Sequence, residues 1–256
     1  GGILTHTGGD SRFDLTITGD LTIDAGGAIN VDSKGYSGSN GPGAGENGPG
    51  AGGGSYGGMG GASGGSGGPV YGLFTEPNEF GSGGGQFTGL GTGGYGGGLI
   101  KLTVGGTLQV EGSVSANGAP GNPAGNLYGG GGSGGGIWIV TNTLTGTGEI
   151  ASMGGGIPCR SGGGGGGRIA VYYDSNSFTG AMTACGGAGY EYGGAGTIYT
   201  KSAVQVYGNL LVDNGGNVGA TTPLLTGTYT FDVLDIVNDG EFEVYAGVVV
   251  DMAPEE

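Results

Sequence analysis

Residues 129–156 read GGGGSGGGIWIVTNTLTGTGEIASMGGG, and the order of residue types in this stretch decides the fold. The β-branched and aromatic residues at 137–140 have the composition of a buried strand. Residues 145–148 predict a turn, and residues 149–152 predict a second, shorter strand. Glycine runs enclose the pair on both sides, so the predicted unit is glycine run, strand, turn, strand and glycine run.

Glycine dominates the whole chain, with 75 glycines in 256 residues. The average in soluble proteins is about 7%. No strict Gly-X-Y period is present, which excludes a collagen triple helix, and the apolar blocks between the glycine runs argue against disorder. Helices are disfavoured because an interior glycine costs about 1 kcal/mol relative to alanine. We therefore expect an all-β fold.

The predicted unit recurs along the chain. Aligning Val114, Ile150, Met182 and Leu211 gives intervals of 36, 32 and 29 residues, which lie in the range of solenoid repeats. Further strands are predicted at 13–17, 21–23, 28–31, 99–104, 107–110, 112–118, 168–173, 178–187, 197–200, 209–216, 229–237, 241–245 and 247–250. The fold that this pattern predicts is a right-handed parallel β-helix or a closely related β-solenoid with long ordered glycine-rich loops. For the N-terminal strands, a meander of antiparallel hairpins is the alternative.

We expect one β-solenoid module over residues 1–256. Residues 1–36 would form an N-terminal coil, and residues 37–98 a glycine-rich loop insertion. Repeated coils with glycine-rich loops would follow at 99–216, and C-terminal coils at 217–256.

The insertion at 37–98 carries isolated aromatic residues and a methionine, which distinguishes it from a Gly/Ser spacer. We expect it to form ordered loops that project from one side of the β scaffold, with a disordered linker as the alternative. Glycine-rich segments can also pack as extended, polyproline-II-like strands, because the missing Cβ atoms let backbones approach closely.

The phrases GGGGSGGGIWI, LTGTGEIASMGGG, GGGGGGRIAVYY and GGAGTIY, with LLVDNGG after them, carry a resemblance. The chain resembles the glycine-rich β-helical modules of large secreted and surface-attached bacterial proteins, from about Leu15 to Val250. The resemblance implies an extracellular or cell-surface location, a β-solenoid fold and an adhesive or structural role. It supplies no catalytic motif and no role for any residue.

The formal net charge is −15, with only 6 Lys and Arg residues. Nucleic acid is not an expected partner, because neutralising phosphates requires clustered Lys and Arg. No run of about 18 apolar residues predicts a membrane span. The chain begins GGILTH without Met or a signal peptide, and we expect a mature or excised fragment. The acidity suits a solvated surface, although the oxygen ligands could also hold calcium; no other cofactor is expected.

Two cysteines, Cys159 and Cys185, are candidates for a disulfide in an extracellular chain. Two separate buried thiols are the alternative. A bound transition metal is not expected, because His6 is the single histidine and no CxxC motif occurs.

Tyr56, Tyr71 and Tyr95 lie in the glycine-rich insertion and are the candidate contact aromatics, because tyrosine rings can stack on sugars. The alternative, which we favour, is that such aromatics anchor the loops internally. Trp138 lies within an apolar strand, where core packing is expected.

A carbohydrate-active β-helix enzyme, such as a lyase or glycosidase, would need paired carboxylates on neighbouring coils. The acids that could form such pairs are Asp14, Asp20, Asp24, Asp32, Asp232, Asp235, Asp239, Glu241 and Glu243. They lie at strand edges and turns, where aspartate ordinarily serves turn geometry, and the middle of the chain contains few acids. We therefore expect no enzyme and no catalytic residue.

The sequence predicts an extracellular structural or adhesive protein, which could be a self-assembling subunit of a cell-surface fibre or matrix. The expected partners are copies of the chain, extracellular glycans or other surface proteins. A carbohydrate-binding or carbohydrate-active β-helix protein is the alternative.

Overall fold

The structure is a computed structural model that describes residues 1–7, 12–88, 90–124, 127–156 and 160–254. These residues form strands and extended segments without a helix, so the all-β prediction is confirmed. No helix in the described ranges could cross a bilayer.

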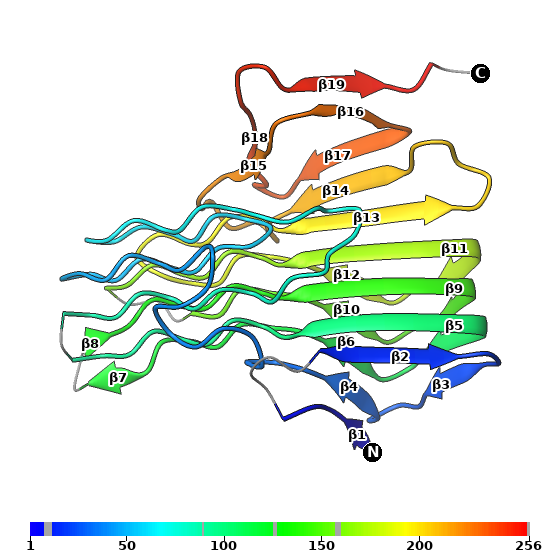
Figure 1. Cartoon of the computed structure of the whole chain (residues 1–256), viewed down its shortest axis with the longest axis horizontal. Helices are drawn as coiled ribbons and strands as arrows, with labels where there is room; N and C mark the ends of the chain where they lie inside the picture. The colour runs from blue at the N-terminus through cyan, green and yellow to red at the C-terminus, as the bar shows by residue number, and fades with distance from the viewer. Residues whose placement is uncertain (8–11, 89, 125–126, 157–159, 255–256) are drawn as a thin grey trace.

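Two sheets contain most of the strands (Figure 1). The first has five strands in the order β1 (Ile3–Leu4), β4 (Ala28–Asn30), β6 (Ser113–Ser115), β10 (Glu149–Ala151) and β12 (Ala181–Thr183). The second has eight: β17 (Val233–Val237), β14 (Asn209–Asp213), β13 (Thr197–Ser202), β11 (Arg168–Phe178), β9 (Gly136–Gly146), β5 (Leu99–Val110) and β2 (Phe13–Ile17) in order, with β3 (Leu21–Ile23) also paired to β5. Three small sheets pair β15 (Thr222–Leu224) with β18 (Phe242–Val244), β16 (Thr228–Phe231) with β19 (Val249–Met252), and β7 (Pro123–Ala124) with β8 (Leu127–Tyr128).

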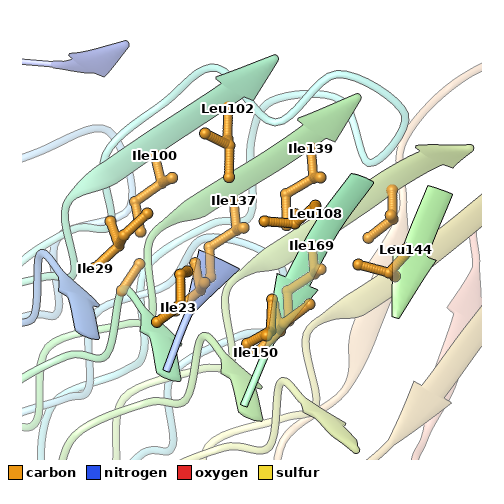
Figure 2. Packing of buried hydrophobic residues seen from close by; sticks show 14 of the residues in the cluster. Ile23, Ile29, Ile100, Leu102, Leu108, Ile137, Ile139, Leu144, Ile150 and Ile169 are labelled. Atoms are coloured by element: carbon orange, nitrogen blue, oxygen red, sulfur yellow. The ribbon is translucent and has the colours of Figure 1, made fainter. Parts of the chain in front are cut away.

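The core lies between the five-stranded and eight-stranded sheets and is built from stacked aliphatic side chains. In the parallel register, Ile100 lies beside Ile137, which lies beside Ile169. All three are fully buried, as are Leu102 and Ile139 in the next inward-facing row (Figure 2). Successive side chains of a strand point to opposite faces, so the two-residue alternation of these segments buries one face. Complete burial of one such side chain contributes about 1.5–3 kcal/mol.

Three of the four residues aligned in the predicted repeat lie side by side in one sheet. Val114, Ile150 and Met182 are direct neighbours in the five-stranded sheet. The alignment of Leu211 with them is wrong, because Leu211 lies in the eight-stranded sheet, opposite Ile198 in an antiparallel pair. The physical reason is the short connection between β13 and β14, since such a connection joins antiparallel neighbours and a parallel crossover needs a dozen or more residues.

The glycine-rich segments of the repeats and of the insertion pack together into what we call the glycine bundle: residues 51–54, 58–61, 81–85, 93–98, 116–119, 129–135, 152–155, 162–167 and 191–196. In its central segment, 162–167, successive N–H groups donate in turn to three neighbouring segments, and every third residue donates to the same neighbour. Residues 162 and 165 donate to Ala51 and Gly54, and residues 163 and 166 donate to Glu191 and Gly194. Residues 164 and 167 donate to Gly155 and Ser152. A helix with three residues per turn produces this period, as polyproline II does.

Segment 130–135 repeats this arrangement. Residues 130 and 133 donate their N–H groups to the carbonyls of Gly85 and Ser82, and residues 131 and 134 donate to those of Gly162 and Gly165. Residues 132 and 135 donate to the carbonyls of Ala119 and Ala116, so the period is again three residues. Each central segment is therefore bonded to three neighbours, and residues far apart in sequence are tied together. The period of three agrees with the alternative that glycine-rich segments pack as polyproline-II-like strands, and the insertion at 37–98 contributes hydrogen-bonded segments to the bundle.

Glycine is required in the bundle because of how closely the backbones approach. A Cβ atom on Gly164 would lie 2.0 Å from the carbonyl oxygen of Gly132, and one on Gly163 would lie 1.9 Å from that of Gly187. A Cβ on Gly131 would lie 1.9 Å from the oxygen of Gly155. These distances lie far inside van der Waals contact, so no larger residue fits without separating the segments.

A second, smaller core covers the opposite face of the eight-stranded sheet. Phe74, from the insertion, packs its ring 5.6 Å from Tyr199 and 5.7 Å from Phe231. The Tyr172 hydroxyl donates to the carbonyl of Thr75 at 2.9 Å. The insertion is thereby fixed against β11 and β13 and connected to the C-terminal strands.

The C-terminal strands pair in parallel with shorter repeats. Leu224 lies beside Val244, Phe231 beside Met252, and Leu211 beside Asp235, which gives spacings of 20, 21 and 24 residues. The spacing is shorter than in the middle of the chain because no glycine run separates these strands.

Candidate functional site

The three candidate contact aromatics occupy different environments. Tyr56 is fully buried, with its ring 4.9 Å from that of Tyr71. The Tyr71 hydroxyl donates to the carbonyl of Phe80 at 2.5 Å and lies 2.8 Å from the Ser82 hydroxyl. Tyr95 is 48% exposed. Tyr56 and Tyr71 thus serve as internal anchors of the insertion, and only Tyr95 presents a ring to solvent.

Trp138 lies on the outward face of β9 and is half-buried. The Lys101 ammonium lies 4.5 Å from the centre of its ring, in a cation–π contact between neighbouring strands. The indole packs against the smaller core. Trp138 is therefore a packing residue, as its place in an apolar strand predicts.

The candidate disulfide involves one cysteine outside the described residues, Cys159. Cys185 is half-buried, and burial, helped by the nearby carboxylate of Asp213, raises the pKa of its thiol. Burial and Lys34 lower the pKa of His6. Within the described ranges, no group of three or more His, Cys, Asp or Glu side chains is placed to hold a metal ion.

Several candidate acids accept backbone hydrogen bonds at turns. Asp20 accepts from the N–H of Thr107 at 2.7 Å, Asp32 from that of Asn117 at 2.6 Å, and Asp232 from that of Gly208 at 2.7 Å. Glu243 accepts from the Thr221 hydroxyl at 2.9 Å. Each of these carboxylates ties one turn or strand end to a neighbour, which is a structural use of the charge.

Four side chains lie on loops that hydrogen bonds connect near β7 and β8, and one of them, Tyr128, belongs to β8 itself. We call Phe87, Leu90, Tyr128 and Tyr190 the tip residues. Leu90 is 57% exposed and Tyr190 is 76% exposed, while Phe87 and Tyr128 are half-buried. The glycine segments leave the two sheets on one side and extend toward β7 and β8, opposite the loop between β13 and β14 (Figure 1).

Hydrogen bonds connect the loops that carry the tip residues. Asn122 donates its backbone N–H to the carbonyl of Thr92 at 2.9 Å. The Ser161 hydroxyl donates to the carbonyl of Tyr128, and the Tyr190 N–H donates to the carbonyl of Ser161 at 2.8 Å. Loops from three parts of the chain are thus fixed relative to one another.

Tyr128 and Tyr190 are absent from the aromatics that the sequence singles out. Each adjoins or separates glycine runs: Tyr128 precedes the run at 129–132, and Tyr190 lies between GGAG and GGAG. An aromatic residue directly beside a glycine run is the sequence signal that could have identified both.

The bundle is thus a support built from hydrogen-bonded backbone, and the loops connected to it carry the tip residues. Comparison of the chain with protein-family models, with curated proteins and with solved structures finds no match.

Proposed function

We propose that the chain is an extracellular adhesive or structural module in which the glycine bundle holds the tip residues as a contact surface. The observation that carries the proposal is the three-neighbour hydrogen bonding of the bundle, which fixes the connected loops before any partner arrives. A contact surface fixed in advance loses less conformational entropy on binding. Tyrosine and leucine side chains supply contact area for a glycan or for the surface of another protein.

We also infer that the sheets belong to a short right-handed parallel β-solenoid. Support comes from the alternation along the chain, since β5 leads to β6, β9 to β10, and β11 to β12, each time from the eight-stranded to the five-stranded sheet. The parallel registers advance by one repeat at each step. Parallel crossover connections are right-handed in about 98% of cases. Such a scaffold suits the proposed extracellular role, because each repeat rests on the one before it.

The test is binding of the purified chain to immobilised glycans and to extracellular matrix proteins. The informative variant combines Leu90→Ala, Tyr128→Ala and Tyr190→Ala. A matched control combines Val204→Ala and Val206→Ala, whose side chains are 91% and 69% exposed in the loop at the opposite end of the molecule.

We expect the tip variant to lose binding by tenfold or more, on the order of 1.4 kcal/mol, with an unchanged melting temperature. The control should bind as the unaltered chain does. Binding to none of the surfaces, or equal binding by both variants, would refute the proposed contact surface.

Self-assembly is a second candidate, favoured by exposed apolar side chains on the outermost strands. Ile3 of β1 and Met252 of β19 are 70% and 52% exposed. Among the described residues, β1 pairs only with β4, and β19 only with β16. Unpaired strand edges with apolar side chains favour pairing with another chain. Electron microscopy and light scattering over a wide concentration range test this candidate, and particles that stay monomeric throughout would exclude it.

A further inference from the structure

Arg168, the first residue of β11, is a buried cation at 3% exposure. Its Nε donates to the carbonyl of Tyr71 at 3.1 Å, Nη1 to the Thr197 hydroxyl at 3.2 Å, and Nη2 to the carbonyl of Tyr56 at 3.3 Å. The guanidinium also lies 5.4 Å from the centre of the Tyr56 ring. A guanidinium has five N–H donors, so two remain beyond these three hydrogen bonds.

Among the described residues, no carboxylate is a hydrogen-bond or electrostatic partner of Arg168. Its hydrogen-bond acceptors are two carbonyls and a hydroxyl, and the groups that act on it electrostatically within the described ranges are the phenols of Tyr56, Tyr71 and Tyr229. Burying a cation without a carboxylate partner is costly, and buried charges in proteins are normally paired. The pKa of Arg168 is accordingly lowered by burial. No negative charge among the described residues offsets this buried cation.

A cavity of about 240 Å³ has Arg168 among its lining residues. Its lining includes the polar residues Arg168 and Thr197 and the apolar residues Phe74, Leu224, Pro223 and Phe242. One water needs about 10–15 Å³ measured in this way, so the space exceeds that of a single solvent molecule. It is smaller than the sites of drug-sized ligands, which span about 300–1,000 Å³.

We propose that this cavity binds a small organic monocarboxylate. Its carboxylate would take the two remaining N–H donors of Arg168, and its apolar part would lie against Phe74 and Leu224. Two N–H donors are what a bidentate carboxylate engages. A single negative charge is specified because the site holds one cation, and the net charge of −15 repels anions of higher charge.

The experiment uses the full chain with benzoate as the probe and benzamide as its neutral counterpart of the same shape. Affinities are measured by calorimetry, and the Arg168 Nε–H resonance is followed by NMR. We expect benzoate to bind at least tenfold more tightly than benzamide and to shift that resonance. Glucuronate, a carboxylate on a sugar ring, distinguishes a sugar acid from a simple acid as the preferred source of the carboxylate.

Two variants separate the proposal from a purely structural role of Arg168. Arg168→Lys keeps the positive charge but removes the planar guanidinium that can donate two parallel hydrogen bonds to a carboxylate. This variant should bind benzoate at least tenfold more weakly. Thr226→Trp places a bulky ring at an exposed position on the cavity wall and leaves Arg168 in place, so it tests the cavity even if Arg168→Lys does not fold. Lys101→Gln removes a cation elsewhere on the sheet and should bind benzoate normally.

Equal affinity for benzoate and benzamide would overturn the proposal and leave Arg168 as a structural residue that binds carbonyls. Benzoate binding that Thr226→Trp leaves unchanged would place the anion outside this cavity and would overturn it as well.

Discussion

Replacement of one glycine at the centre of the bundle should destabilise the whole chain. In Gly164→Ala, the new Cβ would lie 2.0 Å from the oxygen of Gly132, and contacts below 3.0 Å are essentially never seen for a Cβ. Segments 162–167 and 129–135 must therefore separate by about 1 Å. The change cannot be absorbed by a side-chain rotation, because the obstructing atom belongs to the backbone.

The energetic cost follows from the hydrogen bonds at this point. Gly164 donates to Gly155 at 2.8 Å, and Gly155 donates to Gly132 at 2.8 Å. A displacement of about 1 Å would take both beyond hydrogen-bonding distance. Each buried donor left unsatisfied costs about 1–3 kcal/mol, so two cost about 4 kcal/mol. Alanine also lowers the conformational entropy of the unfolded chain, which stabilises the folded state by about 0.4–1 kcal/mol. The expected net loss is about 3 kcal/mol.

The assay is urea denaturation of Gly164→Ala beside Gly19→Ala. No atom lies within 4 Å of a Cβ built on Gly19, so that variant should stay within about 1 kcal/mol of the unaltered chain. A loss of 3 kcal/mol lowers the melting temperature by about 6–12 °C for a chain of this size. Free energies of unfolding that agree within about 0.5 kcal/mol for the two variants would refute the close-packing argument.

Three further predictions concern the core, a polar network and alkaline pH. Ile139→Ala, in the stacked core row, should cost about 2–5 kcal/mol of unfolding free energy in guanidinium titrations, and a loss below 1 kcal/mol would contradict the stacking. Asn214→Ala removes a side chain that accepts from the Gly186 N–H at 2.8 Å and donates to the carbonyl of Asn217 at 2.6 Å; calorimetric melting should show a loss of about 2–3 kcal/mol, and an unchanged transition would argue against this network. Burial raises the pKa of the Tyr56 phenol, so the unfolded chain loses this proton near pH 10 while the folded chain retains it. Stability should then fall by up to about 1.4 kcal/mol per pH unit above pH 10, and Tyr56→Phe should make the fall shallower; an equal slope in both proteins would show that this phenol is not responsible.

The positions of strands can be predicted from the sequence, because alternating apolar and polar residues show which face of a strand is buried. Residues 13–17 and 21–23 form strands with the predicted bounds. The predicted end of a strand is less accurate where hydrogen bonding to a neighbouring strand extends it beyond its apolar residues. β9 continues through Thr145 and Gly146, which were expected to form a turn, because Thr145 pairs with Ser177 and Gly146 with Phe178 of β11. Local turn propensity is overridden by a complete parallel neighbour.

From the sequence, the glycine bundle can be predicted only as one of several structures that a glycine-rich segment could form. A linker, a projecting loop and a polyproline-II-like segment have the same composition, and what separates them is the number of backbone neighbours. Gly165, for instance, donates to Gly54, which is 111 positions earlier in the chain. No local pattern encodes that partner.

Arg168 shows the same limit for a charged residue. It follows a run of six glycines at 162–167, where a cation would ordinarily be solvated. Its carbonyl acceptors lie 97 and 112 residues away in the insertion. Burial of this side chain therefore depends on how segment 51–98 folds over the eight-stranded sheet, which only the tertiary structure reveals.

The use of backbone instead of side chains for packing determines where sequence change is tolerated. In an ordinary core, a neighbouring side chain can adjust to a substitution, whereas in the bundle each glycine meets carbonyl oxygens of hydrogen-bonded segments. Most bundle positions are glycine and offer no side chain for recognition. Side chains for recognition of a partner are then concentrated where bundle segments reverse direction, with the exposed Tyr95 of segment 93–98 in addition. Among the tip residues, Leu90 and Tyr190 are exposed and Phe87 and Tyr128 are half-buried, so substitutions at these positions should affect binding more than stability.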